Sequence, residues 1–181
     1  MKEIHMVPAD SMGSQLRVLA GKAIYDPHYR YIFMNRNIDP ESIIEYSSRN
    51  PSFAIMDGDN ICGYIYGSIY DTGVVEEVFF TSFNRQNLQA IKGAAWFLNH
   101  MFQFKKVKSI VFGGCSDNPA VKLYHSLEKY GVRHAGRMYG DIILHDGTIH
   151  NSDQFQLMDS DYLKHQCFYE KMATGVSLKL S

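Results

Sequence analysis

The segment 118–131 places a tyrosine on a short helix with clear start and stop signals. Asn118 is a good helix cap, and Pro119 suits the first helical position, where its missing N–H has no cost. Gly131 supplies a left-handed stop. The apolar face of this predicted helix carries Ala120, Leu123, Tyr124, Leu127 and Tyr130. The pattern therefore turns Tyr124 inward beside a polar helix N-terminus, either as a functional hydroxyl or as a core residue.

Two adjacent glutamates, Glu76 and Glu77, lie on a predicted strand at 74–81. Neighbouring strand residues point to opposite faces, so at most one of the two can face a single cleft. Simple alternation groups Glu77 with Val75, Phe79 and Thr81. Glu77 is thus the better candidate for a group that acts in a cleft, although both glutamates could also be solvated residues.

Hydrophobic periodicity predicts the elements that must position these residues. Strands are expected at 4–7, 53–56, 61–70, 74–81, 109–113, 137–144 and 148–157. Helices are expected at 11–23, with Asp10 or Ser11 as the cap, at 39–46, at 88–102 and in 118–131. Turns are expected at 57–60 and at Asp146-Gly147, the latter a type I′ hairpin flanked by His145 and Thr148. This order predicts an α/β fold with a mixed, mostly antiparallel sheet and helices on both faces.

Composition and charge narrow the class of protein. A chain of 181 residues with 45% hydrophobic and 20% charged residues predicts a single globular domain over 1–181. The net charge of −1 gives no strong nucleic-acid signal. The three cysteines have no metal-ligand spacing, no histidine pair has the i, i+4 spacing of a zinc site, and no apolar run would span a membrane. We therefore expect a cytoplasmic protein without a metal site.

The sequence resembles GNAT-type N-acetyltransferases over about residues 4–162, leaving 163–181 as a tail. Asn118-Pro119-Ala120 through Tyr124 to Gly131 is similar to the family signature Asn-x-x-Ala-x-x-x-Tyr-x-x-x-Gly-Phe, with Val132 in place of Phe. The stretch 135–157 is similar to the closing hairpin of the subgroup that acetylates ribosomal-protein N-termini. The resemblance implies the GNAT fold and acetyl-CoA as co-substrate, and it is compatible with a homodimer.

In that family a bulged strand leads into a helix N-terminus that holds the pyrophosphate of acetyl-CoA. The family loop, Gln/Arg-x-x-Gly-x-Gly/Ala, matches Arg85 and Ala90 here, whereas Leu88 stands where glycine is usual. A second register would use Gly93 and Ala95, but the first leaves the helix at its expected length. The cofactor-binding residues implied are Phe80, Thr81, Arg85, Gln86, Asn87, Leu88, Gln89, Ala90 and Asn118.

The resemblance implies acyl transfer by direct attack of an amine on the thioester. Such a reaction needs a base for the amine and an acid for the leaving thiolate. Tyr124 is similar to the family tyrosine that serves as the acid, and Glu77 matches a glutamate that some members carry. The acceptor is an amine of unknown identity, a protein N-terminus or a small molecule. The alternative is a catalytically degenerate GNAT-fold protein that acts as a binding or structural component.

Overall fold

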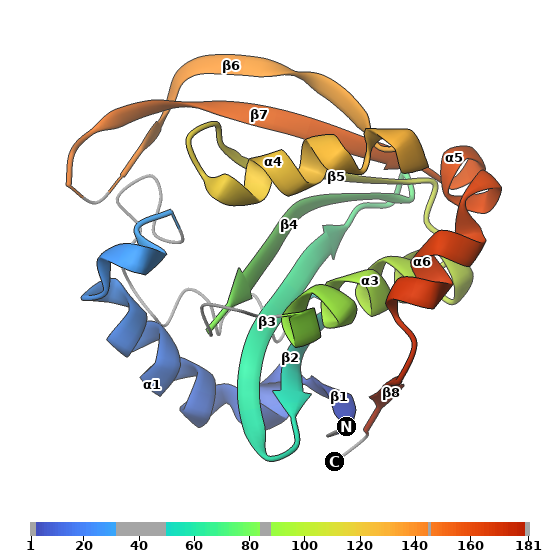
Figure 1. Cartoon of the computed structure of the whole chain (residues 1–181), viewed down its shortest axis with the longest axis horizontal. Helices are drawn as coiled ribbons and strands as arrows, with labels where there is room; N and C mark the ends of the chain where they lie inside the picture. The colour runs from blue at the N-terminus through green and yellow to red at the C-terminus, as the bar shows by residue number, and fades with distance from the viewer. Residues whose placement is uncertain (1–2, 32–49, 84–87, 145, 180–181) are drawn as a thin grey trace.

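The computed structural model describes residues 3–31, 50–83, 88–144 and 146–179 (Figure 1). The helix expected at 39–46 and the loop residues Arg85, Gln86 and Asn87 lie outside them. The core of the described residues is one mixed sheet with the strand order β6-β7-β5-β4-β3-β2-β1-β8. The pairs β4–β5 and β1–β8 are parallel and the other pairs are antiparallel, which confirms the predicted sheet class.

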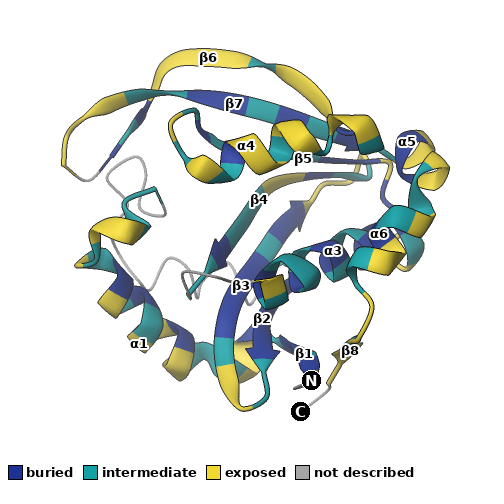
Figure 2. Cartoon of the chain, viewed as in Figure 1, coloured by how far each residue is buried: buried dark blue, intermediate teal, exposed yellow. Residues whose placement is uncertain are grey.

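The strands of this sheet follow the predicted apolar runs, except that β6 begins at Arg133 instead of Arg137 and β8 was not predicted. They are β1 (Ile4–Pro8), β2 (Ser52–Asp57), β3 (Asn60–Ile69), β4 (Val74–Ser82), β5 (Ser109–Cys115), β6 (Arg133–Ile143), β7 (Ile149–Met158) and β8 (Val176–Leu178). Strands β2 and β3 are buried along most of their length, whereas β6 is exposed along most of its own (Figure 2).

Helices cover both faces of the sheet, as expected. They are η1 (Ala9–Met12), α1 (Gly13–Ile24), η2 (Pro27–Tyr29), α3 (Leu88–Gln103), α4 (Pro119–Ser126), η3 (Glu128–Tyr130), α5 (Asp159–Lys164) and α6 (Gln166–Met172). The larger core cluster packs α3, α4 and α6 on one face, and a smaller cluster beside α1 packs on the other (Figure 1).

Three local predictions need correction. The first helix starts at Gly13 and lacks a side-chain cap, because residues 9–12 form η1. On the apolar face expected in 118–131, Tyr124, Leu127 and Tyr130 pack against the main core as expected, but Leu123 is 38% exposed and Val121 is the buried residue of α4. The final hairpin is not a type I′ turn, because Gly147 has a positive φ and Asp146 does not.

The segment after β7, which the sequence left without assigned elements, is an ordered part of the sheet and core. It forms α5 and α6 and then β8, which extends the sheet by pairing with β1. Asn99 of α3 donates to the Tyr169 carbonyl of α6 (3.0 Å) and accepts from the Tyr162 hydroxyl (2.7 Å). These buried polar contacts attach the C-terminal segment to α3.

Asp161 joins α5 to the start of β6 and makes stability depend on pH. Its carboxylate accepts hydrogen bonds from Lys164 (3.0 Å) and from Arg133, and these bonds lower the pKa of Asp161. A lowered folded-state pKa contributes stability above the unfolded value of about 3.9 that is lost as pH falls through the folded pKa. We expect Asp161→Asn to lower the melting temperature at neutral pH. The decrease in melting temperature between neutral and acidic pH should then be smaller than in the unsubstituted protein.

Melting temperatures measured from about pH 3 to about pH 7 check this prediction. Asp71→Asn, in the exposed turn before β4, is the matched control and should follow the unsubstituted protein. Parallel profiles for the Asp161→Asn and unsubstituted proteins would show that this ion pair does not contribute to acid sensitivity.

Candidate active site

The sheet divides between its two central parallel strands. β4 and β5 pair at Val74–Ser109, Val75–Ile110 and Val78–Phe112, and within the described residues the pairing ends there. β4 continues to pair with β3 as far as Ser82, and β5 with β7 as far as Cys115. The two strands therefore run apart toward their C-terminal ends (Figure 1), and among the described residues no strand pairs with this edge of β4 at Phe79, Phe80 and Thr81.

A β-bulge at Glu76–Glu77 begins this division. The register of β4 shifts against both neighbours here, and Glu77 has φ +54°, a left-handed conformation that is rare outside glycine. The extra residue breaks the simple alternation that the sequence predicts for this strand. Val75 and Phe79 consequently belong to different core clusters, so the expectation that Glu77 shares one face with both is wrong.

The side chain of Glu77 lies on the sheet face beside α1. Its carboxylate accepts a hydrogen bond from Ser68 (3.0 Å), and Ser68 alternates along β3 with Tyr64 and Tyr66, which belong to the α1-side cluster. Glu77 is exposed. It is thus placed on the opposite face of the sheet from α3 and α4, at the point where β4 and β5 separate.

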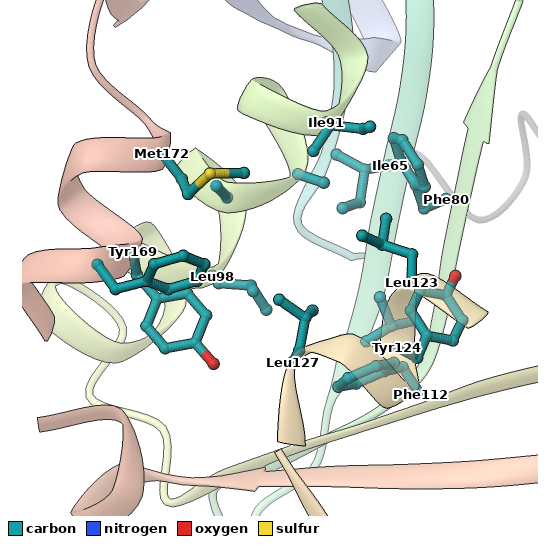
Figure 3. Close-up of a pocket in the computed structure, with 14 residues that line it drawn as sticks. Ile65, Phe80, Ile91, Leu98, Phe112, Leu123, Tyr124, Leu127, Tyr169 and Met172 are labelled. Carbon is teal, nitrogen blue, oxygen red and sulfur yellow. The ribbon is translucent and has the colours of Figure 1, made fainter. Parts of the chain in front are cut away.

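An apolar cleft occupies the α3 face at the division of the sheet. It is lined by Ile65, Val78, Phe80, Ile91, Ala94, Ala95, Leu98, Phe112, Leu123, Tyr124, Leu127, Phe168, Tyr169 and Met172. Figure 3 shows side chains from α3, α4 and α6 facing a common space, with Met172 and Tyr169 across it from Tyr124 and Phe80. None of these lining side chains is charged, so the cleft excludes ionic groups and suits an uncharged chain.

Tyr124 lies in this cleft against two aromatic rings. Its ring meets Phe112 edge to face at 5.1 Å and Phe155 at 5.5 Å between centroids. Within the described residues its hydroxyl has no hydrogen-bond partner, and the oxygen is drawn at the Phe80 end of the ring in Figure 3. Burial raises the pKa of Tyr124 to about 12, so the phenol keeps its proton at neutral pH and can donate it.

The start of α3 separates the predicted loop residues into different environments. Leu88 is 60% exposed, and its side chain and that of Gln89 line a hollow with Asp57 and Lys92 near the β1–β8 edge. Ala90 is fully buried in the main core. The side chain of Leu88 therefore points away from the apolar cleft, and that of Ala90 is a packing group.

The remaining predicted cofactor-binding residues also lie in different environments. Phe80 lines the cleft, whereas Thr81 is buried opposite Tyr64 in the β3–β4 pairing. Asn118 caps α4, because its side-chain oxygen accepts from the Ala120 N–H at 3.0 Å. The structure thus brings Tyr124 and Phe80 together, and it places Glu77, Thr81 and Ala90 elsewhere.

Sequence reasoning missed the contribution of the C-terminal helix to the cleft. Phe168, Tyr169 and Met172 of α6 form one wall, and the Phe168 ring stacks on Tyr130 at 3.5 Å between centroids. The i, i+1, i+4 spacing of these three residues is a helical signal that could have found them. It could not have shown which cleft they line.

Comparisons with solved structures identify the fold. A protein of T. thermophilus assigned as an acetyltransferase matches with a TM-score of 0.69 and 14% identity over 94% of each chain. A GCN5-related N-acetyltransferase from Brucella melitensis gives 0.63 and 13%, covering 89% of this chain and 79% of that one. Spermidine N-acetyltransferase from Vibrio cholerae, in complex with CoA and spermine, gives 0.65 and 16%, covering 83% and 93%.

The chain therefore has the fold of GNAT acetyltransferases. No protein-family model matches its sequence, and no curated protein matches it either. In the described part of the chain, none of the helices combines the length and the apolar character needed to cross a bilayer.

Proposed function

We propose that this protein is an acetyl-CoA-dependent N-acetyltransferase of the GNAT family. The observation that carries the proposal is the division of β4 from β5 beside an apolar cleft that contains a protonated tyrosine. The fold of the neighbours supports the same function, and one of them is in complex with CoA.

The cleft and the free edge of β4 fit an acetyl-CoA substrate. Backbone groups of β4 beyond Val78 can hydrogen-bond the amides of a pantetheine chain, while apolar side chains such as Phe80 and Leu98 pack against its carbon atoms. The N-terminus of α3, which begins at Leu88, presents the positive end of a helix dipole to the pyrophosphate.

In the proposed reaction the acceptor amine attacks the thioester carbonyl and a thiolate leaves. Tyr124 donates its phenolic proton to the departing sulfur, because it is protonated and lies in the cleft. The amine must lose a proton, and Glu77 is the candidate base on the opposite face at the division of the sheet. An acceptor approaching from the α1 side would meet Glu77 while the thioester lies on the α3 side.

We propose two classes of acceptor for testing. The resemblance of 135–157 to the hairpin of enzymes that acetylate ribosomal-protein N-termini makes a peptide α-amine the first acceptor to test. Spermidine is the second, because a structural neighbour from Vibrio cholerae is a spermidine N-acetyltransferase.

Filling the cleft tests the proposed substrate site. Acetyl-CoA at about a hundredfold excess over its Kd should raise the melting temperature of the unsubstituted protein by roughly 5–10 °C. Ala94→Phe places a ring in the cleft. We expect this variant to fold and to lose most of the shift, because the ring takes the space of the pantetheine chain.

Val18→Phe, on the exposed side of α1, is the matched control and should keep the full shift. Absence of a shift in the unsubstituted protein at millimolar acetyl-CoA would favour the degenerate scaffold over the enzyme. A full shift in Ala94→Phe would mean that acetyl-CoA binds outside this cleft.

A further inference from the structure

Three potential metal ligands from separate elements meet on the outer side of α4. His125 lies on α4, His134 on β6 and Asp153 on β7, and one ligand atom of each lies within 4.8 Å of the others. The rings of His125 and His134 both contact Phe155, with centroids 4.9 and 5.2 Å away. Phe155 is also a neighbour of Tyr124, so the cluster lies directly behind one wall of the cleft.

The spacing of these atoms suits a tetrahedral ion. His134 Nε2 lies 3.1 Å from Asp153 Oδ1. Two ligands of a tetrahedral zinc ion, each about 2.1 Å from the metal, are separated by roughly 3.4 Å. Zinc can therefore replace the proton between these two atoms with little movement, and the neutral His134 ring then carries its proton on Nδ1.

Neighbouring groups hold the ligands in a metal-binding orientation. Glu128 contacts His125 Nδ1 at 2.6 Å, which places the ring proton on Nδ1 and leaves Nε2 free to bind a metal. Arg137 donates from Nε to Asp153 Oδ1 and from Nη2 to Asp153 Oδ2, each at 2.8 Å, which fixes that carboxylate and means that a bound ion would share Oδ1 with Arg137. Arg137 also adds a positive charge, so the affinity should be lower than that of a closed four-ligand site.

The cluster has a protein side and a solvent side. Asp153 is 1% exposed, whereas the side chains of His125 and His134 are 44% and 34% exposed. An ion can thus enter from solvent and reach a buried carboxylate, with water completing its coordination. Two imidazoles and one carboxylate favour zinc over magnesium, which prefers oxygen ligands.

A second group of potential ligands, Cys115, Asp117 and His150, is less suitable. His150 Nε2 is engaged outside the group by Thr148 at 2.8 Å, whereas its Nδ1 meets Asp117 of the same group at 2.6 Å. Cys115 is fully buried in a small apolar cluster. To reach Cys115, an ion there would have to enter packed core.

We propose that His125, His134 and Asp153 form a zinc site that joins α4 to the β6–β7 hairpin. The bound ion links the helix that carries Tyr124 to a strand pair of which β6 is exposed along most of its length. This inference is independent of the acetyl-transfer proposal, because its test measures metal binding alone.

Calorimetry and melting curves with zinc chloride test the site, with magnesium chloride as the negative control. All proteins carry Cys167→Ser, since that exposed thiol could bind zinc elsewhere. We expect binding of one zinc ion per chain and a rise in melting temperature of roughly 5–10 °C at about a hundredfold excess over Kd. Magnesium should have no such effect.

Variants locate the ion. His134→Gln should abolish the zinc effect, and Glu128→Gln should weaken zinc affinity about 10–100-fold, as loss of an orienting carboxylate does. His28→Gln, in η2, is the matched control and should bind zinc normally. If His134→Gln fails to fold, His125→Gln on the exposed side of α4 carries the same test. Lack of saturable zinc binding, or unchanged affinity in the His125 or His134 variant, would overturn the proposal.

Discussion

Replacing Tyr124 by phenylalanine should lower the turnover of acetyl transfer by roughly 10²–10⁴-fold, the contribution typical of a positioned acid. The ring keeps its contacts with Phe112 and Phe155, and the hydroxyl has no partner among the described residues. The melting temperature and the acetyl-CoA affinity should therefore stay close to those of the unsubstituted protein. Steady-state rates with the identified acceptor, together with melting curves, make the measurement.

Tyr162→Phe is the matched control for this experiment. The Tyr162 hydroxyl donates to Asn99 in the core and lies outside the cleft. Its removal should cost about 1 kcal/mol of stability, or a few degrees in melting temperature, with turnover unchanged. If Tyr124→Phe instead gives a destabilised protein with full activity, Tyr124 is a core residue and another group protonates the thiolate.

Introducing a carboxylate at Ala90 should prevent folding. Ala90 is fully buried against Gly63. A Cβ atom added to Gly63 would lie 3.1 Å from the Cβ of Ala90, so there is no room at position 90 for a longer side chain. An unpaired buried charge costs about 5 kcal/mol or more, which is comparable to the whole stability of a domain. Circular dichroism and melting curves of Ala90→Glu should show an unfolded or severely destabilised chain.

Leu88→Glu, two residues earlier, provides the contrast. Leu88 is 60% exposed at the first turn of α3, where a negative charge interacts favourably with the helix dipole. Its stability should change by no more than about 0.5 kcal/mol. A stable, native-like Ala90→Glu protein that merely loses acetyl-CoA binding would contradict the core position of Ala90 and restore its predicted place in the phosphate loop.

The sequence alone predicted most elements of the fold because their signals are local. Apolar, β-rich runs bounded by turn residues predicted β2, β3 and β4, and the Asp57-to-Asn60 turn between β2 and β3 is present as expected. The cap at Asn118 and the left-handed Gly131, with φ +91°, also formed where predicted. Each of these features depends on backbone preferences and side chains within a few residues, which a single sequence records directly.

Only the tertiary structure shows where a strand is irregular and which elements, far apart in the sequence, pack together. The bulge at Glu77 reverses the alternation of β4, and neither glutamate carries a local signal for it, since the bulge depends on how β3 and β5 pair with that strand. The residues of α6 that line the cleft show a helical pattern in the sequence, but nothing in that pattern indicates that they face α3 and α4.

The histidine cluster shows the same limit most clearly. His125 and His134 are nine residues apart in the sequence and lack the i, i+4 spacing of a helical zinc site, so the sequence predicted no metal. The packing of α4 across the β6–β7 hairpin brings both beside Asp153. Side-chain chemistry and local conformation can thus be read from the order of residues, whereas their convergence depends on burial of apolar faces, such as those around Phe155, that belong to elements far apart in the chain.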